Sequence, residues 1–177
     1  ISIVEDVLIE FNKEIVNALN NQSCETRRIT SKEYNIITVK PESEELGFVG
    51  TPTNIKGNVL KEIIKVNEVP VIAPLGLDKN NQTFNINADT VAGAIAKELK
   101  ARRLIIISDV EGVLGDEKKL IPEINSVQAK QMINNEIISG GMIPKINNCL
   151  DVAKNGVKAV CIIDGRKNHS ILFELLS

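Results

Sequence analysis

The segment Arg103-Leu-Ile-Ile-Ile-Ser-Asp-Val-Glu-Gly-Val-Leu114 predicts the fold class of this 177-residue chain. Its apolar run from Leu104 to Ile107 indicates a strand buried on both faces, as in a parallel sheet. Ser108 and Asp109 follow at the carboxyl end of that strand, where open α/β sheets bind their ligands. We therefore expect an α/β fold with a ligand site at this edge of the sheet.

Just upstream, Asn85-Ile-Asn-Ala-Asp89 predicts the start of a helix. Asn87 is a favourable N-cap, and the following residues have helical character to about Lys100. Asp89 then falls in the first turn, where the helix dipole favours a carboxylate in any protein. A second interpretation is that Asp89 faces cationic groups near a phosphate site and that Asn85 offers its amide to a ligand. The residues alone leave both interpretations open.

Downstream, Ile137-Ile-Ser-Gly-Gly-Met-Ile-Pro-Lys145 predicts another helix start. The glycines leave backbone N–H groups accessible, and Pro144 is tolerated only in a first helical turn. Such a terminus with the Lys145 ammonium beside it attracts polyphosphate. A glycine-entered surface helix without a ligand has the same pattern. Apolar residues continue the helix at the expected spacing: Ile146, Leu150 and Ala153.

The remaining elements follow from local patterns. An apolar stripe at helical spacing predicts an N-terminal helix: Val4, Leu8, Phe11, Ile15 and Leu19. Alternation in Arg27–Thr30 and Asn35–Val39 suggests a short hairpin. Further elements are expected as a helix over 58–67, a strand over 69–73, a turn over 78–81, a strand over 157–163 and a short amphipathic helix over 170–176.

Composition excludes several classes of function. The chain is 43% hydrophobic and 25% charged with a net charge of −2, so it is globular and has no general attraction for nucleic acid or anionic membranes. Only 3% of its residues are aromatic, so we expect no stacking surface for single strands. Cys24, Cys149 and Cys161 are odd in number and widely spaced, which indicates reduced thiols in a cytosol-like compartment.

Six motifs together identify a family resemblance. They are Gly47-Phe-Val-Gly50, Pro70-Val-Ile-Ala-Pro74, Asn85-Ile-Asn-Ala-Asp-Thr-Val-Ala-Gly93, Ser108-Asp-Val-Glu-Gly-Val-Leu114, Ser139-Gly-Gly-Met-Ile-Pro-Lys145 and Ile163-Asp-Gly-Arg166. In this order they resemble the amino-acid kinase family, and within it the kinases of N-acetyl-L-glutamate. The resemblance implies a three-layer α/β/α sandwich around an open, mainly parallel sheet. It also implies transfer of the γ-phosphoryl group of ATP to the side-chain carboxylate of N-acetyl-L-glutamate, a step of arginine biosynthesis.

The resemblance assigns roles to individual residues. Lys145 and Asp89 would be catalytic, and Asn85 would bind the amino-acid substrate. Mg²⁺ would be held mainly by the phosphates of ATP and by water, without a protein metal site. The residues implied at the ATP site are Ser108, Asp109, Val110, Gly112, Leu114, Ile137, Ser139, Gly140, Gly141, Met142 and Lys145.

The resemblance also suggests that the chain is one domain fragment. Residues 1–85 would be the remainder of a substrate-binding lobe, and 86–177 a nucleotide-binding lobe. The glycine-rich loops that open the family's sequences, one with a phosphate-binding lysine, have no match here, so we expect these 177 residues to be inactive alone. An inactive nucleotide-binding or regulatory fragment, or a related kinase with another substrate, remains an alternative.

Partners and localisation follow from the same resemblance. The intact protein is expected to be a homo-oligomer in the cytoplasm, with a plastid stroma as the alternative. Arginine and the signalling protein PII are possible regulators. His169, the single histidine, would lie in an arginine pocket or on a plain surface.

Overall fold

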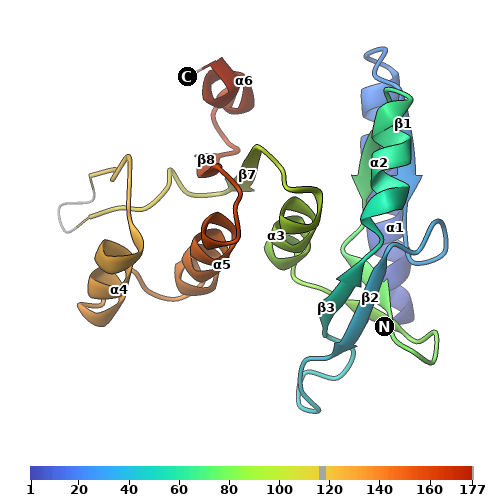
Figure 1. Ribbon diagram of the computed structural model, residues 1–177, viewed down its shortest axis with the longest axis horizontal. Coiled ribbons are helices and arrows are strands. Elements are labelled where there is room, and N and C mark those ends of the chain that lie inside the picture. The colour runs from blue at the N-terminus through green and yellow to red at the C-terminus, as the bar shows by residue number, and fades with distance from the viewer. Residues whose placement is uncertain (116–118, 177) are drawn as a thin grey trace. The chain divides into compact units, whose positions relative to one another are not determined.

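The computed structural model describes residues 1–115 and 119–176. These residues belong to two compact units, Ile1–Leu99 and Lys100–Ser177. Figure 1 colours the first unit blue to green and the second green to red. Each unit combines helices with parallel strand pairs, as β1 with β4 and β7 with β8 illustrate. The predicted α/β class is confirmed.

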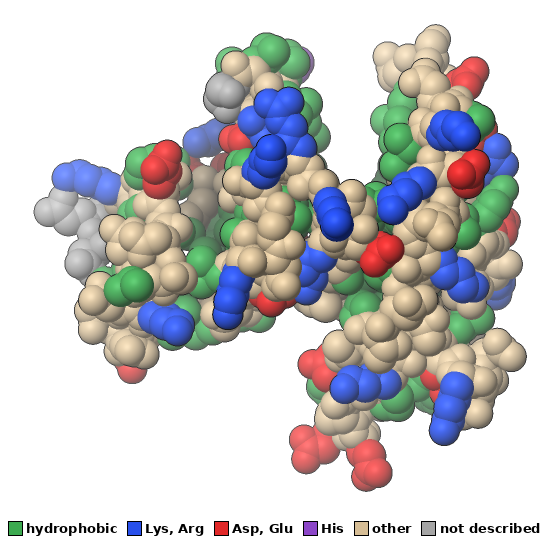
Figure 2. All heavy atoms as spheres, viewed as in Figure 1, with side chains coloured by type: hydrophobic (Ala, Val, Ile, Leu, Met, Phe, Trp, Pro, Cys, Tyr) green, Lys and Arg blue, Asp and Glu red, His purple; other side chains and the backbone are tan. Residues whose placement is uncertain are grey.

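The surface carries charges of both signs. Figure 2 shows basic and acidic side chains interspersed over the face in view. Within the part of the chain that the structure describes, no helix has the length and apolar character needed to cross a membrane.

The first unit contains two sheets. Its elements are α1 (Ser2–Asn20), β1 (Thr26–Ile29), β2 (Ile37–Pro41), β3 (Gly50–Ile55), α2 (Gly57–Lys65), β4 (Val69–Ile72), β5 (Leu75–Leu77), β6 (Thr83–Asn85) and α3 (Ala88–Leu99). One sheet pairs β1 with β4, and the other has the order β3-β2-β5-β6. Strand β2 runs parallel to β5, while β3 and β6 are antiparallel to their neighbours. Buried isoleucines and leucines such as Ile37, Leu60 and Ile86 form the core.

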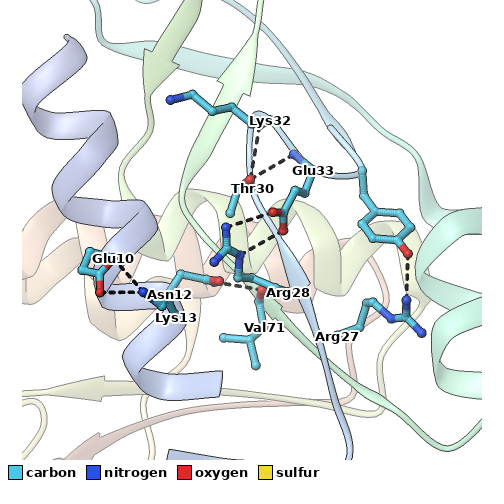
Figure 3. Close-up of polar contacts among 10 residues, drawn as sticks. Glu10, Asn12, Lys13, Arg27, Arg28, Thr30, Lys32, Glu33 and Val71 are labelled. Carbon is cyan, nitrogen blue, oxygen red and sulfur yellow. Dashed lines mark hydrogen bonds and ion pairs between the residues drawn. The ribbon is translucent and has the colours of Figure 1, made fainter. Parts of the chain in front are cut away.

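The predicted hairpin over Arg27–Val39 is wrong. Strand β1 pairs in parallel with β4, whereas β2 pairs with β3 and β5. The connection from β1 to β2 does not form a hairpin turn between them. Thr30 is buried, and its Oγ1 accepts the backbone N–H groups of Lys32 and Glu33, as Figure 3 shows. Tyr34 ends this turn in the left-handed region, with φ 67°. Non-local pairing of β1 outweighed the local alternation of the sequence.

Helix α1 forms as predicted, but it packs through a different face. Asn12 is buried and its Nδ2 donates to the Val71 carbonyl at 2.9 Å (Figure 3), which ties the helix to β4. Glu5 accepts hydrogen bonds from Ser31 and Thr83 on the same side. These polar contacts rotate the expected stripe outward, so only Leu8 and Leu19 of that stripe are half-buried. Its other members are exposed: Val4, Phe11 and Ile15.

The second unit is built on one parallel strand pair. Its elements are β7 (Arg103–Ser108), α4 (Ser126–Asn134), α5 (Met142–Lys154), β8 (Ala159–Asp164) and α6 (Ser170–Leu176). Strands β7 and β8 are in register from Arg103 opposite Ala159 to Ser108 opposite Asp164. A separate hydrophobic cluster fills the space between the loops and helices α4 and α5: Val113, Ala129, Ile138 and Ile146.

One burial prediction fails in this unit. Leu104 and Ile106 are buried, but Ile107 is 54% exposed, so the second face of β7 is not covered at its carboxyl end. In α5, Ile146 and Val152 are buried, while Ala153, near the end of the helix, is exposed. Helix α6 has no buried residue. Apolar runs predict the elements here, while the packing partners decide which face is covered.

Candidate nucleotide and substrate site

The start of α3 holds the predicted substrate-side residues together. Asn87 caps the helix as predicted, because its Oδ1 accepts the Thr90 N–H at 3.1 Å. Asp89 lies in the first turn and is half-buried. Asn85 is the last residue of β6, directly before this connection. The first unit therefore groups Asn85 and Asp89 in one short strand-to-helix segment.

A glycine-containing loop lies against Asn85. The Asn85 N–H donates to the Phe48 carbonyl at 2.9 Å, and the Phe48 and Phe84 rings are 5.8 Å apart. A Cβ on Gly50 would come within 2.9 Å of the Phe84 Cβ, so this close approach requires glycine. The segment Gly47–Gly50 is one of the six sequence motifs, and the sequence alone indicates no contact for it. The structure places its backbone beside the predicted substrate residue.

The loop after β7 carries the first group of predicted ATP residues. Ser108 ends the strand half-buried, Asp109 is exposed, and Val110 and Leu114 are half-buried. Gly112 is buried with φ 137°, a conformation that side chains rarely adopt. A Cβ there would also come within 2.8 Å of the Leu120 Cδ1. The glycine therefore fixes the path of the loop beyond the carboxyl end of β7.

The start of α5 carries the second group. Ser139, Gly140 and Gly141 are exposed, and Gly140 has φ 53°. Gly141 is the N-cap without a side-chain hydrogen bond, and the first turn contains no acidic residue. The Met142 and Ile143 N–H groups donate to the carbonyls of Ser139 and Gly140 at 3.2 Å, which closes the turn. Across residues 1–115 and 119–176, Gly140 and Gly141 donate no backbone hydrogen bond outside regular elements.

The second unit brings the two predicted ATP segments into one core. Val113, from the loop after β7, belongs to the same hydrophobic cluster as Ile138 and Met142, which flank the diglycine. Ile137 and Lys145 are half-buried at the two ends of that segment. The residues implied at the ATP site are therefore all in the second unit, and two segments separated in sequence share packing partners there.

The turn after β8 is a charged feature to which sequence analysis gave no role. Asp164 is buried, and its two carboxylate oxygens accept from Nε and Nη2 of Arg166, both at 2.9 Å. These hydrogen bonds lower the pKa of Asp164 to about 2. The sequence signal for this turn is the carboxylate of Asp164 at the end of an apolar strand, because a carboxylate that is buried there needs a partner nearby.

A cavity of about 890 Å³ lies beside this strand pair. It is lined by apolar residues of α5, β8 and α6 and by the loop that contains Gly112. Cys149 and Cys161 also face it. Burial raises the pKa of the Cys161 thiol to about 11, and its Sγ donates to Glu174 Oε1 at 2.9 Å. A protonated thiol of this kind is unreactive.

The geometry of both units can be compared with known proteins. The model of the amino acid kinase family matches residues 2–164, which include every residue predicted for the catalytic, substrate and ATP sites. The chain belongs to the amino acid kinase family. This membership confirms the family resemblance that the six motifs predicted.

Individual relatives and solved structures are also similar. The acetylglutamate kinase of Pelagibacter ubique is 76% identical over all 177 residues, and the chain spans 62% of that relative's length. The crystal structure of smu.665 from Streptococcus mutans has a TM-score of 0.79 at 30% identity, covering 85% of this chain and 61% of that one. Isopentenyl phosphate kinase has a TM-score of 0.75 at 19% identity, covering 99% and 65%. The amino acid kinase fold is thereby confirmed.

Proposed function

We propose that the protein containing this chain transfers the γ-phosphoryl group of ATP to the side-chain carboxylate of N-acetyl-L-glutamate, in arginine biosynthesis. The observation that carries the proposal is the 76% identity with an acetylglutamate kinase over the full chain. The chain spans about 62% of that relative, so the activity is proposed for the whole protein.

The nucleotide side of the reaction is assigned to the second unit. Backbone N–H groups at the start of α5 form the positive end of the helix dipole, where phosphate oxygens are stabilised. The glycines there have no neighbour within 4 Å of an added Cβ, so a phosphate can approach the backbone. Lys145 lies one turn into the helix. We assign to its ammonium the neutralisation of negative charge on the phosphoryl group during transfer.

The acceptor side is assigned to the first unit. Asn85 carries amide donor and acceptor groups suited to the acetamido or α-carboxylate group of the substrate. Asp89 is the only acidic residue in the first turn of α3, and we assign to it the orientation of cationic groups around the phosphates. Because the acceptor is a carboxylate, which is ionised near neutral pH, the reaction requires no general base.

Magnesium enters this proposal as part of the substrate MgATP. The described residues contain no group of three or more His, Cys, Asp or Glu side chains placed to hold a metal ion. A nucleotide-bound Mg²⁺ that keeps several waters fits this arrangement, because it needs few protein ligands.

We also propose that the intact protein is a homo-oligomer. Three apolar residues of α1 recur at four-residue spacing and are exposed by 79%, 61% and 57%: Ile3, Val7 and Phe11. A second copy of the same helix would cover this stripe. Sedimentation of the intact protein should give a dimer or larger species, and Phe11→Lys should shift it toward the monomer. Sedimentation as a monomer would contradict this part of the proposal.

The test of the function uses a chimera. This chain replaces the matching segment of the Pelagibacter ubique relative, which supplies the remaining length. Purified chimera with MgATP and N-acetyl-L-glutamate should form ADP at a rate that requires both substrates. Binding of MgADP without any turnover would instead support an inactive nucleotide-binding module. Turnover with another amino acid, but not with N-acetyl-L-glutamate, would support a different kinase of the family.

A further inference from the structure

The turn Asp164–Lys167 is attached to the loop after β7 at two points. The Gly165 N–H donates to the Ser108 carbonyl at 2.8 Å, and Lys167 Nζ lies 3.5 Å from Glu111 Oε1. The first contact extends the β7–β8 register beyond its last pair, Ser108 with Asp164. The turn therefore follows the loop closely from Ser108 to Glu111.

Gly165 makes the tightest contact of the turn. A Cβ at this position would lie 2.5 Å from the Cγ2 atom of Ile107 and 3.4 Å from the Ser108 carbonyl oxygen. The first distance is far below van der Waals contact, so any side chain must displace Ile107 or the turn. Isoleucine is branched at Cβ, and its Cγ2 therefore moves only if χ1 or the backbone changes. Ile107 immediately precedes Ser108, so displacement reaches the loop directly.

The Asp164 carboxylate fixes the conformation of the turn through hydrogen bonds. Its carboxylate is buried and accepts the Arg166 backbone N–H at 2.9 Å in addition to two guanidinium hydrogen bonds. Arg166 is otherwise largely exposed. Three hydrogen bonds over two residues leave the turn little conformational freedom. The ion pair between Lys167 and Glu111 is exposed at both ends and adds little.

We propose that the Asp164–Lys167 turn is a positioning element for the nucleotide, with Gly165 as its principal residue. It sets the backbone of Ser108–Gly112, and through that loop the affinity for MgADP and MgATP. The inference rests on the proposed nucleotide-binding role of the loop. None of the residues of the turn needs to touch the nucleotide.

The experiment compares three variants of the 177-residue chain: Gly165→Ala, Ile107→Leu and the double variant. Leucine lacks Cγ2, so the double variant removes the atom that the new methyl group would meet. Gly165→Ala should raise the Kd for MgADP about tenfold, since displacements near 1 Å in a positioned site have effects of this order or larger. Ile107→Leu should change the Kd little, and the double variant should recover most of the loss.

The kinetic readout uses the same variants in the chimera. Gly165→Ala should raise KM for ATP and leave KM for N-acetyl-L-glutamate unchanged, a separation that general destabilisation would not produce. An unchanged Kd for MgADP in folded Gly165→Ala would overturn the inference. Failure of the double variant to recover binding would also overturn it. Absence of MgADP binding by the unsubstituted chain would overturn both this inference and the proposed nucleotide site.

Discussion

Helices α3 and α5 both begin next to predicted site residues, yet their first turns are opposite in chemistry. In α3, Asn87 accepts a backbone N–H and Asp89 places a carboxylate at the positive end of the dipole. In α5, Gly141 provides no side-chain cap and the first turn has no acidic residue. At the start of α3, the negative charge that the helix dipole favours is supplied by the chain itself. The start of α5 has no such charge, so an external anion is favoured there.

This comparison separates two roles that a helix start can have. A capped and acidic start stabilises its own helix without an external anion, and its carboxylate suits cationic groups, in agreement with the role proposed for Asp89. A diglycine start is less stable locally, because glycine is unfavourable in regular structure. It also leaves the backbone N–H groups accessible to a ligand, because glycine lacks a Cβ. The phosphate site is therefore expected at α5.

The largest effect is expected for Lys145→Ala in the chimera. If its ammonium acts mainly on transition-state charge, kcat should fall roughly a hundredfold or more, as commonly follows loss of one preorganised electrostatic group. KM for ATP should change less, because backbone N–H groups share ground-state binding. Lys154→Ala, in the last turn of the same helix, is the matched control and should keep kcat. A near-normal kcat with a greatly raised KM would make Lys145 a binding residue instead.

A smaller effect is expected from an acidic residue at the start of α5. Gly141 has φ −65° and open space around an added Cβ, so substitution is sterically tolerated. Gly141→Asp should raise the Kd for MgADP about fivefold or more, since one close like charge costs at least about 1 kcal/mol even when water screens it fully. Gly141→Asn has the same shape without the charge and should have a much smaller effect. Equal loss in both variants would mean that shape, and not charge, decides.

Removal of the N-cap of α3 should affect stability and not nucleotide binding. Asn87→Ala removes the cap to the Thr90 N–H and should lower the free energy of unfolding by about 1 kcal/mol. Urea denaturation measures this loss, with the exposed helical residue Asn147→Ala as the control. The Kd for MgADP should stay unchanged. Weaker MgADP binding in the Asn87 variant would break the distinction between the two helix starts.

Acid should affect the two regions differently. The pKa of Asp164 is lowered to about 2 in the folded chain by Arg166. Its contribution to stability is therefore fully present above the unfolded pKa of about 3.9 and is lost as the pH falls toward 2. The difference in melting temperature between the unsubstituted chain and Asp164→Asn should shrink between pH 4 and pH 2. The Asn87 cap does not titrate, so the corresponding difference for Asn87→Ala should stay constant.

The sequence predicts those parts of the site that local chemistry controls. The Asn87 cap, the strand ending at Ser108 and the diglycine helix start each depend on neighbouring residues, and the structure confirms them. The order of the six motifs was sufficient to identify the family, whose model matches residues 2–164. The catalytic roles of Lys145 and Asp89, and the division into lobes at residue 85, stay predictions.

The errors arise where distant contacts decide. The hairpin failed because β1 pairs with β4, forty-odd residues away in sequence, as the partners Arg28 and Val71 show. The apolar stripe of α1 predicts the helix but not the face that packs, because buried Asn12 donates to the Val71 carbonyl and sets the orientation of the helix. Gly165 carried no sequence signal for its contact with Ile107, because that contact depends on the register of β7 and β8.

The most direct test of the central claim is a titration of the ¹⁵N-labelled 177-residue chain with MgADP, followed by its backbone amide resonances. We expect shifts concentrated in Ser139–Met142 and Ser108–Leu114, with the amides of Asn87–Val91 nearly unchanged. This result would place the anion at the uncapped helix start. Shifts concentrated at Asn87–Val91, or no shifts at millimolar MgADP, would contradict the account.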